Sequence, residues 1–252
     1  MALYFVSSLH KSHCVRDAIL MNVQLADGSA LHGLALGLPG RLEVWNVGSQ
    51  PPRKVMQDDL NSAYRHLIKV PSSQGTEDAF VVVESNMISV CTVWKGKVRV
   101  WSQQRLVGKK EVMTNEWLLL SDKQGDGHHL VLGDHTSQLT VHRIELIDGE
   151  WRLQSQFAVN LDHIEFGMFH TSSLGKDSTN LTFGILAGTI DIASHITILE
   201  IDAEKKAVAA SNQLHEISLK TRESSESFHE KVFRIFELKQ KSLVMFCSHS
   251  IK

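Results

Sequence analysis

The sequence has few of the residues that cross-link, break or stiffen a chain. Its 252 residues include 3 cysteines, 4 prolines and 2 tyrosines. Cys14, Cys91 and Cys247 lie too far apart to indicate the dense disulfide framework of small secreted proteins. The low proline content, with 16 glycines, excludes collagen-like and low-complexity classes. We therefore expect free thiols and a reducing compartment, either the cytosol or the nucleus.

Long apolar runs and an excess of charge of one sign are absent as well. No segment reaches the roughly 18 consecutive apolar residues of a membrane span, so we expect no membrane partner. The formal net charge is −2 and the pI about 6.7, which gives no chain-wide field for nucleic acid or anionic lipid. Any nucleic-acid contact would have to be local and weak.

Enzyme signatures are also missing. The sequence has no Gly-x-Ser-x-Gly elbow, phosphate-binding Gly-Lys-Ser loop, dinucleotide-binding Gly-x-Gly-x-x-Gly or His-Glu-x-x-His pair. A catalytic triad can still assemble from distant positions, so a propeller enzyme with convergent carboxylates or histidines stays an alternative. We predict a non-enzymatic protein with no cofactor and no small-molecule substrate.

One segment, GDGHHLVLGDHTS, is rich in metal-ligand residue types. It holds Asp126, His128, His129, Asp134 and His135. Adjacent histidines in a strand point to opposite faces, however, and Gly133-Asp134-His135 falls where a repeated pattern places a turn. We interpret the segment as a polar hairpin and predict no metal site.

A repeated strand–turn–strand pattern is what the sequence does contain. GLALGLPGRLEVWNVG combines an apolar run, a Pro-Gly turn and an alternating strand. The pattern returns in AFVVVESNMISVC, HLVLGDHTSQLTVH and LTFGILAGTIDIASHITIL, and SLVMFCSHSIK begins a fifth copy. The second strands begin about 46 to 57 residues apart, at Leu42, Ile88, Leu139, Ile196 and Ile251.

A repeat of this length built from about four strands is typical of a propeller blade. WKGKVRVWS, EWLLLSD and WRLQSQFAV supply further strands. The sequence predicts an all-β fold, a β-propeller of four-stranded antiparallel blades, as one partial domain over residues 1–252. It also predicts four inward-facing side chains, those of Val44, Val90, Val141 and Ile198.

The segment WKGKVRVW, residues 94–101, is the one candidate interaction site. Strand alternation would place Lys95, Lys97, Arg99 and Trp101 on one face. Basic residues beside an aromatic ring can hold phosphates and stack a base, so this face could contact nucleic acid or a protein partner. The alternative is that Trp94, Val98 and Val100 pack inside and the basic face is only solvated.

The remaining tryptophans support expectations of their own. Trp45, Trp94 and Trp117 stand beside strand positions, where we expect them to pack in the core or between blades. Trp151 follows a turn in DGEWRL and is expected to be the exposed one.

The order of these features resembles the N-terminal propeller of one superfamily. It comprises the large subunits of the damage-specific DNA-binding protein and of the cleavage and polyadenylation specificity factor, and the propeller subunit of splicing factor 3b. The resemblance rests on an aromatic first strand at Leu3-Tyr4-Phe5-Val6 and the later segments RLEVW, EDAFVVVES, LVLGDHTSQLTVHRIEL, HITILEIDAEKK and LVMFCSHSIK. It is slightly nearer to the damage-binding branch.

The resemblance implies a scaffold that binds other subunits of a large nuclear complex, such as a cullin ubiquitin ligase adaptor in DNA repair. A nucleic-acid-associated subunit of a splicing or 3′-end processing complex is the alternative. The resemblance also implies that the protein is located mainly in the nucleus, with the cytoplasm as the second location. Contacts in the family lie on variable loops, so no contact residue carries over.

The chain departs from the family in length. The members are several times longer, and their first propeller is a ring of about seven blades, whereas the sequence holds about five, the last incomplete. We expect a fragment or one piece of a longer scaffold, with an incomplete propeller.

Overall fold

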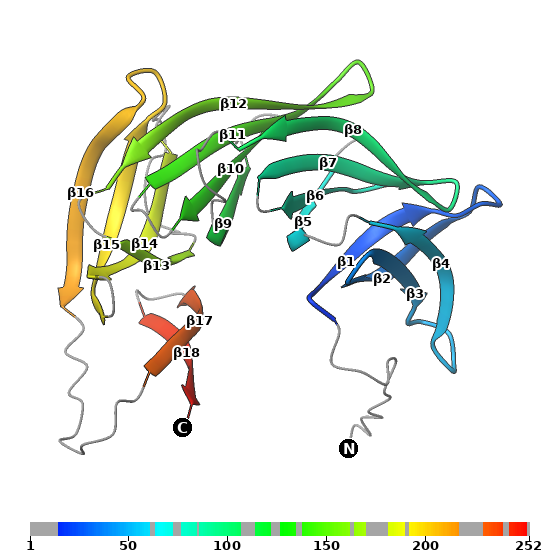
Figure 1. Cartoon of the computed structure of the whole chain (residues 1–252), viewed down its shortest axis with the longest axis horizontal. Helices are drawn as coiled ribbons and strands as arrows, with labels where there is room; N and C mark the ends of the chain where they lie inside the picture. Colours follow the sequence, from blue (N-terminus) through cyan, green and yellow to red (C-terminus); the bar gives the residue numbers. More distant parts are fainter. Residues whose placement is uncertain are drawn as a thin grey trace. The chain divides into compact units, whose positions relative to one another are not determined.

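A computed structural model describes most of the chain, namely residues 15–60, 64–72, 77–84, 86–106, 114–121, 127–134, 138–161, 164–169, 181–189, 192–216, 229–238 and 242–250. These residues form strands and turns and no helix, so they include no helix able to cross a membrane. The prediction of an all-β fold is confirmed (Figure 1).

The described residues form eighteen strands in five sheets, and neighbours in each sheet are neighbours in the chain. Sheet 1 consists of β1 (Asp17–Gln24), β2 (Ala30–Leu38), β3 (Arg41–Asn46) and β4 (Arg53–Asp59). Sheet 2 consists of β5 (Tyr64–Val70), β6 (Ala79–Glu84), β7 (Met87–Trp94) and β8 (Lys97–Arg105). Each is an antiparallel meander, because every strand pairs with the next along the chain.

The other sheets repeat this order. Sheet 3 consists of β9 (Thr114–Ser121), β10 (Gly127–Asp134), β11 (Gln138–Ile147) and β12 (Glu150–Asn160). Sheet 4 consists of β13 (Ile164–Phe169), β14 (Leu181–Thr189), β15 (Ile192–Asp202) and β16 (Ala207–Glu216). Sheet 5 pairs β17 (His229–Leu238) with β18 (Ser242–Ser250).

The predicted hairpin is the central strand pair of sheets 1 to 4. In sheet 1 Leu38 pairs with Arg41 across a two-residue turn, where Gly40 has φ +76° after Pro39. This is the left-handed position that a type II turn assigns to glycine. Ile251 lies outside the described residues, as do the aromatic first strand at Leu3–Val6 and Cys14.

The chain divides into two units. The first contains sheets 1 and 2 together with Gly127 and residues 144–153, and the second contains β9, the rest of β10, the remainder of β11 and β12, and sheets 4 and 5. In the first unit one core joins the facing sides of sheets 1 and 2. Sheet 1 contributes Met21, Val23, Ala35, Leu42, Val44 and Met56, and sheet 2 contributes Leu67, Phe80, Val82, Cys91 and Val93.

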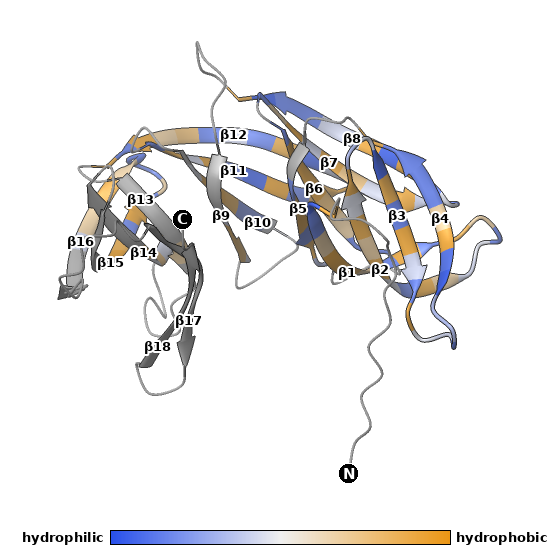
Figure 2. Ribbon diagram, turned by 60° about the horizontal axis from the view of Figure 1, so that its bottom comes forward, coloured by the Kyte–Doolittle hydropathy of each residue, from blue (hydrophilic) through white to orange (hydrophobic). Residues whose placement is uncertain are grey.

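Sheet 2 differs from an ordinary half-solvated antiparallel sheet, because its central strands are buried on both faces. Every residue of β6 is buried, and in β7 only the two ends are not. Phe80 and Val82 point into the core shared with sheet 1, while Val81 and Val90 are fully buried without belonging to that core. The sequence of β6 is therefore an apolar run, as is typical of a strand covered on both sides. Figure 2 colours the hydrophobic residues of β6 and β7 orange.

Three aspartates connect sheets 1 and 2 by accepting hydrogen bonds from backbone N–H groups of the other sheet. Asp17 accepts from Leu67 N at 2.9 Å, and Asp58 accepts from Val98 N at 2.6 Å. Asp78, which is 3% exposed, accepts from Asn22 N at 2.7 Å and forms an ion pair with Lys69 Nζ at 3.0 Å. Carboxylates of this kind satisfy N–H groups that strand pairing leaves open.

The second unit has a core of the same composition. Strands β9 to β12 supply Leu118, Val131, Leu139, Val141 and Val159, and β13 to β15 supply Met168, Leu181, Phe183, Ile185, Leu199 and Ile201. Val44, Val90 and Val141 are 0% exposed and Ile198 is 6% exposed. All four side chains are buried, as predicted, and Val44 and Val141 belong to the two cores.

Candidate functional site

The predicted interaction residues lie on the β7–β8 hairpin. Trp94 pairs with Lys97, and the two residues between them, Lys95 and Gly96, have φ values of +51° and +74°. Positive φ at both turn positions is the geometry of a type I′ turn, which suits the twist of a hairpin. The strand position predicted for Lys95 is therefore wrong, because Lys95 lies in the turn and β8 begins at Lys97.

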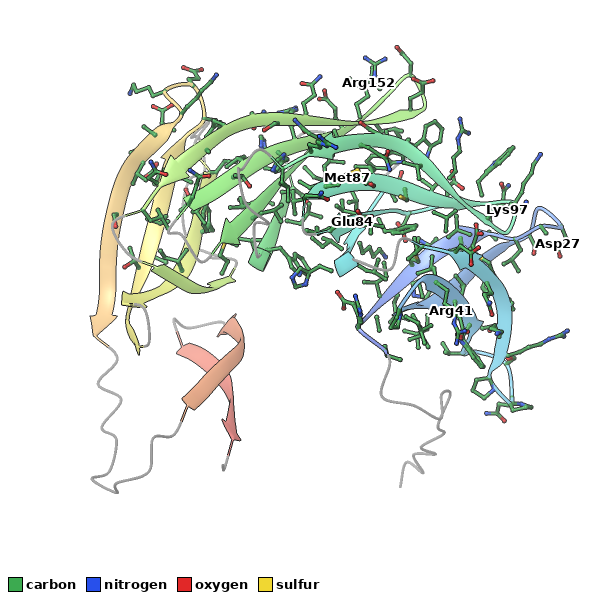
Figure 3. All side chains as sticks on the ribbon, viewed as in Figure 1. Asp27, Arg41, Glu84, Met87, Lys97 and Arg152 are labelled. Carbon is green, nitrogen blue, oxygen red and sulfur yellow. The ribbon has the colours of Figure 1, made fainter. Side chains whose placement is uncertain are left out.

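The turn is fixed against the turn between β1 and β2. Gly96 N donates a hydrogen bond to Gln24 O at 3.1 Å, and a Cβ built on Gly96 would lie 3.3 Å from Ala26 Cβ. In Figure 3 the labelled Lys97 and Asp27 mark this end of the first unit. A side chain at position 96 therefore meets both strain and crowding.

We expect Gly96→Ala to lower the free energy of unfolding by more than Gly40→Ala does. Both glycines have positive φ, which costs an alanine about 1–2 kcal/mol. A Cβ on Gly40 has no atom within 4 Å, so only Gly96→Ala adds the contact with Ala26. Urea denaturation of the two variants makes the comparison. A smaller loss for Gly96→Ala would mean that the turn does not rest on Ala26.

Four residues of the hairpin form a tryptophan–arginine cluster, defined as Trp94, Lys95, Arg99 and Trp101. The Arg99 guanidinium lies 3.6 Å from the ring centroid of Trp101 and 5.8 Å from that of Trp94. Lys95 Nζ lies 4.2 Å above the Trp94 ring. Trp101 is itself held, because its Nε1 donates to Thr92 Oγ1 at 3.0 Å. These are distances at which cation–π attraction is effective.

The cluster is exposed and positively charged. Lys95, Lys97 and Arg99 are exposed, and Trp94 is 40% exposed. Within the described part of the chain, none of the three cations has a carboxylate in ion-pair contact, although the Arg99 charge lowers the pKa of Glu77. Burial raises that pKa by more, so the pKa of Glu77 stays above its ordinary value. The three cations thus face solvent, and Glu77 lies close enough to Arg99 for its pKa to respond to that charge.

Several expectations for this region and for the tryptophans are wrong. Trp94 and Val100 do not pack inside, since they are 40% and 49% exposed. A β-bulge at Trp101 shifts the register of β8 against β7, which the alternation rule does not foresee. Trp151 is not exposed but 4% accessible, because residues 144–153 belong to the first unit. Trp45 and Trp117 are half-buried.

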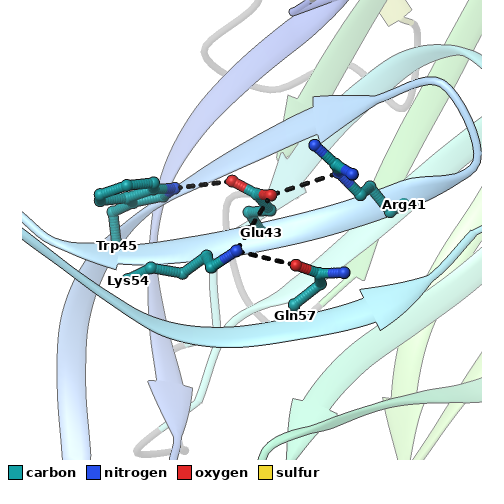
Figure 4. Close-up of polar contacts among 5 residues, drawn as sticks. All are labelled: Arg41, Glu43, Trp45, Lys54 and Gln57. Atoms are coloured by element: carbon teal, nitrogen blue, oxygen red, sulfur yellow. Dashed lines mark hydrogen bonds and ion pairs between the residues drawn. The ribbon is translucent and has the colours of Figure 1, made fainter. Parts of the chain in front are cut away.

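A buried carboxylate that the sequence did not reveal lies on β3. Glu43 is 2% exposed, and its oxygens lie 3.2 Å from Arg41 Nε and 3.4 Å from Lys54 Nζ (Figure 4). Trp45 Nε1 donates to the second oxygen at 3.1 Å, and Lys54 Nζ also donates to Gln57. The charge is fully compensated, as buried charges require. Its partners stand on the same strand or across from it, so the network holds sheet 1 together.

The two adjacent histidines of β10 turn to different partners. His128 Nδ1 lies 3.0 Å from Ser121 Oγ, and His129 Nδ1 lies 3.2 Å from Gln156 Oε1. The structure brings no three metal-ligand residue types together among the residues it describes. Strand β10 continues to Asp134, so Gly133 and Asp134 belong to the strand and not to the predicted turn. Asp126 and His135 lie outside the described residues.

Two other buried titratable groups are neutral by virtue of their surroundings. Burial raises the pKa of the Cys91 thiol to about 12, with the nearby Glu84 charge contributing, so Cys91 is an unreactive core residue. Burial lowers the pKa of His142 to about 4, and its Nε2 lies 3.2 Å from Thr140 Oγ1. His142 is 2% exposed.

We expect His142→Leu to reduce the acid sensitivity of the fold. The folded-state pKa of His142 lies below the unfolded value, so the unfolded state binds more protons and stability falls as the pH drops from about 6.5 to about 4. In this window the protonation of His142 in the unfolded state lowers the free energy of unfolding by up to about 1.4 kcal/mol per pH unit. Denaturation across this window should give a shallower slope of stability against pH for His142→Leu than for the wild type. Equal slopes in the two proteins would contradict a buried neutral His142.

No family model matches the chain, and no curated protein sequence matches it significantly. Function has to be argued from the tryptophan–arginine cluster and from the sheets that support it.

Proposed function

We propose that the chain is a non-enzymatic protein-interaction scaffold built as a β-propeller, acting within a larger nuclear assembly such as a ubiquitin ligase adaptor complex in DNA repair. Four meander sheets with one strand order support the architecture. So does the burial of both faces of strands β6 and β7, because the central strands of a propeller blade are covered on each side.

The tryptophan–arginine cluster is the observation that carries the interaction function. Tryptophan and arginine are the residue types most enriched at positions that dominate protein–protein binding energy. Here they stand together on a rigid hairpin, with Trp94 40% exposed and Arg99 exposed. By contrast, the buried Glu43 and Asp78 are committed to holding the sheets.

Cross-linking and affinity purification of the wild-type protein from cells of its own source test this function. We expect defined protein subunits to co-purify and to persist after nuclease treatment. The variant Trp94→Ala should recover less of them, while Leu20→Ala, a change at a residue 50% exposed in sheet 1, should recover the wild-type amount. Recovery of no partner, or equal recovery with Trp94→Ala, would contradict a scaffold that uses this surface.

A nucleic-acid-associated subunit is the second candidate, favoured by the exposure of Lys97 and Arg99 on one strand. We expect the triple change of Lys95, Lys97 and Arg99 to Ser to leave the melting temperature intact, since surface charges contribute little to stability. Loss of nucleic-acid retention at low salt in that variant would promote this second function.

A further inference from the structure

We propose that the tryptophan–arginine cluster is a docking site for an acidic peptide segment of a partner protein, with a carboxylate of that segment bound by the Arg99 guanidinium. The inference rests on the proposed scaffold function and names the chemistry of its partner. The site lies on the β7–β8 hairpin, where Lys95 and Lys97 precede Arg99.

Arg99 is prepared to bind an oxyanion. Its guanidinium stacks on Trp101 at 3.6 Å, and Trp101 is fixed through Thr92. Stacking uses the flat face of the guanidinium and leaves its N–H edge for hydrogen bonding. Since the side chain is already held, less conformational entropy is lost on binding, and a planar carboxylate can accept two parallel hydrogen bonds.

The charge around Arg99 favours an acidic partner. Lys95 and Lys97 are exposed with no ion-pair partner in the described part of the chain, in contrast to Lys54 and Lys69, which contact Glu43 and Asp78. Among the carboxylates in the described part of the chain, Glu77 is the one whose pKa the Arg99 charge lowers, and it is half-buried. A second and a third carboxylate on the same peptide segment would lie near these lysines. This charge complementarity would raise the association rate and the specificity of binding.

The same geometry disfavours single-stranded nucleic acid as the occupant. Base stacking requires an open aromatic face. Arg99 covers a face of Trp101, and Lys95 lies over the ring of Trp94. A carboxylate needs only the guanidinium edge, so it can bind without displacing either cation.

Fluorescence anisotropy with a labelled peptide of alternating Glu and Leu tests the proposal, using the full chain. We expect saturable binding that weakens with salt, and none to the peptide with every Glu replaced by Gln. Arg99→Lys keeps the charge but not the planar fork, and should weaken binding about tenfold. Glu77→Gln removes a competing negative charge and should tighten binding about twofold. Arg152→Ala, at an exposed arginine of β12, should have no effect.

Each outcome decides the proposal. Wild-type affinity in Arg99→Lys, or equal binding of the Gln peptide, would overturn it. A labelled oligothymidine that binds more tightly than the Glu peptide and is lost in Arg99→Lys would replace the peptide with nucleic acid. If the peptide fails to bind while Trp94→Ala still loses its co-purifying subunits, the scaffold function stands and the acidic chemistry alone is wrong. Circular dichroism of each variant confirms that it is folded.

Discussion

Aspartate in place of Val44, Val90, Val141 or Ile198 is expected to lower the free energy of unfolding by about 3–5 kcal/mol, or to prevent folding. Each side chain is buried in an apolar environment, three of them completely. A carboxylate there would lose its hydration with no partner in reach, and even its protonated form would bury an unsatisfied hydroxyl. Chemical denaturation gives the free energies, and expression in soluble form gives a second readout.

The matched control is Val47→Asp, because Val47 is 42% exposed. This change should alter stability by less than about 0.5 kcal/mol. If aspartate is tolerated equally at Val44 and Val47, the register of the repeated strand is wrong. Loss at the two sites of one unit with no loss at those of the other would confine the error to that unit.

Asp78→Ala is expected to cost about 3 kcal/mol, since removing one member of a buried charged network leaves the others unpaired. The Asp78 carboxylate accepts a hydrogen bond from Asn22 N of sheet 1 at 2.7 Å and forms an ion pair with Lys69 Nζ of sheet 2 at 3.0 Å. Removing the carboxylate takes this acceptor from the Asn22 N–H group and the counter-charge from Lys69, which is one-third exposed.

Asp59→Ala is the control for this change, because Asp59 is an exposed aspartate at the end of β4. It should stay within about 0.5 kcal/mol of the wild type. Similar stability of the two variants would show that Asp78 does not connect sheets 1 and 2. Hydrogen exchange at Asn22 provides a local measurement, as the amide should exchange faster in Asp78→Ala than in Asp59→Ala.

The hairpins could be predicted from the sequence because their causes are local. Alternation of apolar and polar residues decides which side chains point inward, and the Pro39-Gly40 pair specifies the turn between β2 and β3. The burial of Val44 follows from the same alternation, whereas Val90 lies in a strand that is buried on both faces. Alternation also fails in β8, where a bulge leaves Trp101 unpaired and Val100 is exposed.

What the sequence could not reveal depends on residues far apart in the chain. Asp17 and Leu67, or Asp58 and Val98, meet only once two sheets are packed together. Trp151 is buried for a similar reason, as it belongs with a unit formed mainly by earlier residues. Within the candidate site, the exposed cations were foreseeable from WKGKVRVW, but stacking of Arg99 on Trp101 required the three-dimensional arrangement.

The contiguity of sheet 1 has a consequence for synthesis on the ribosome. All four of its strands lie between Asp17 and Asp59, so the sheet can assemble before any strand of sheet 2 leaves the exit tunnel. Short loops between paired strands make such assembly fast. During that interval Met21, Val23 and Val44 have no counterpart, because the other half of their core comes from β5 to β7. A nascent chain that pauses when β4 has just left the exit tunnel should therefore present a transient apolar face, which is the kind of surface that chaperones recognise.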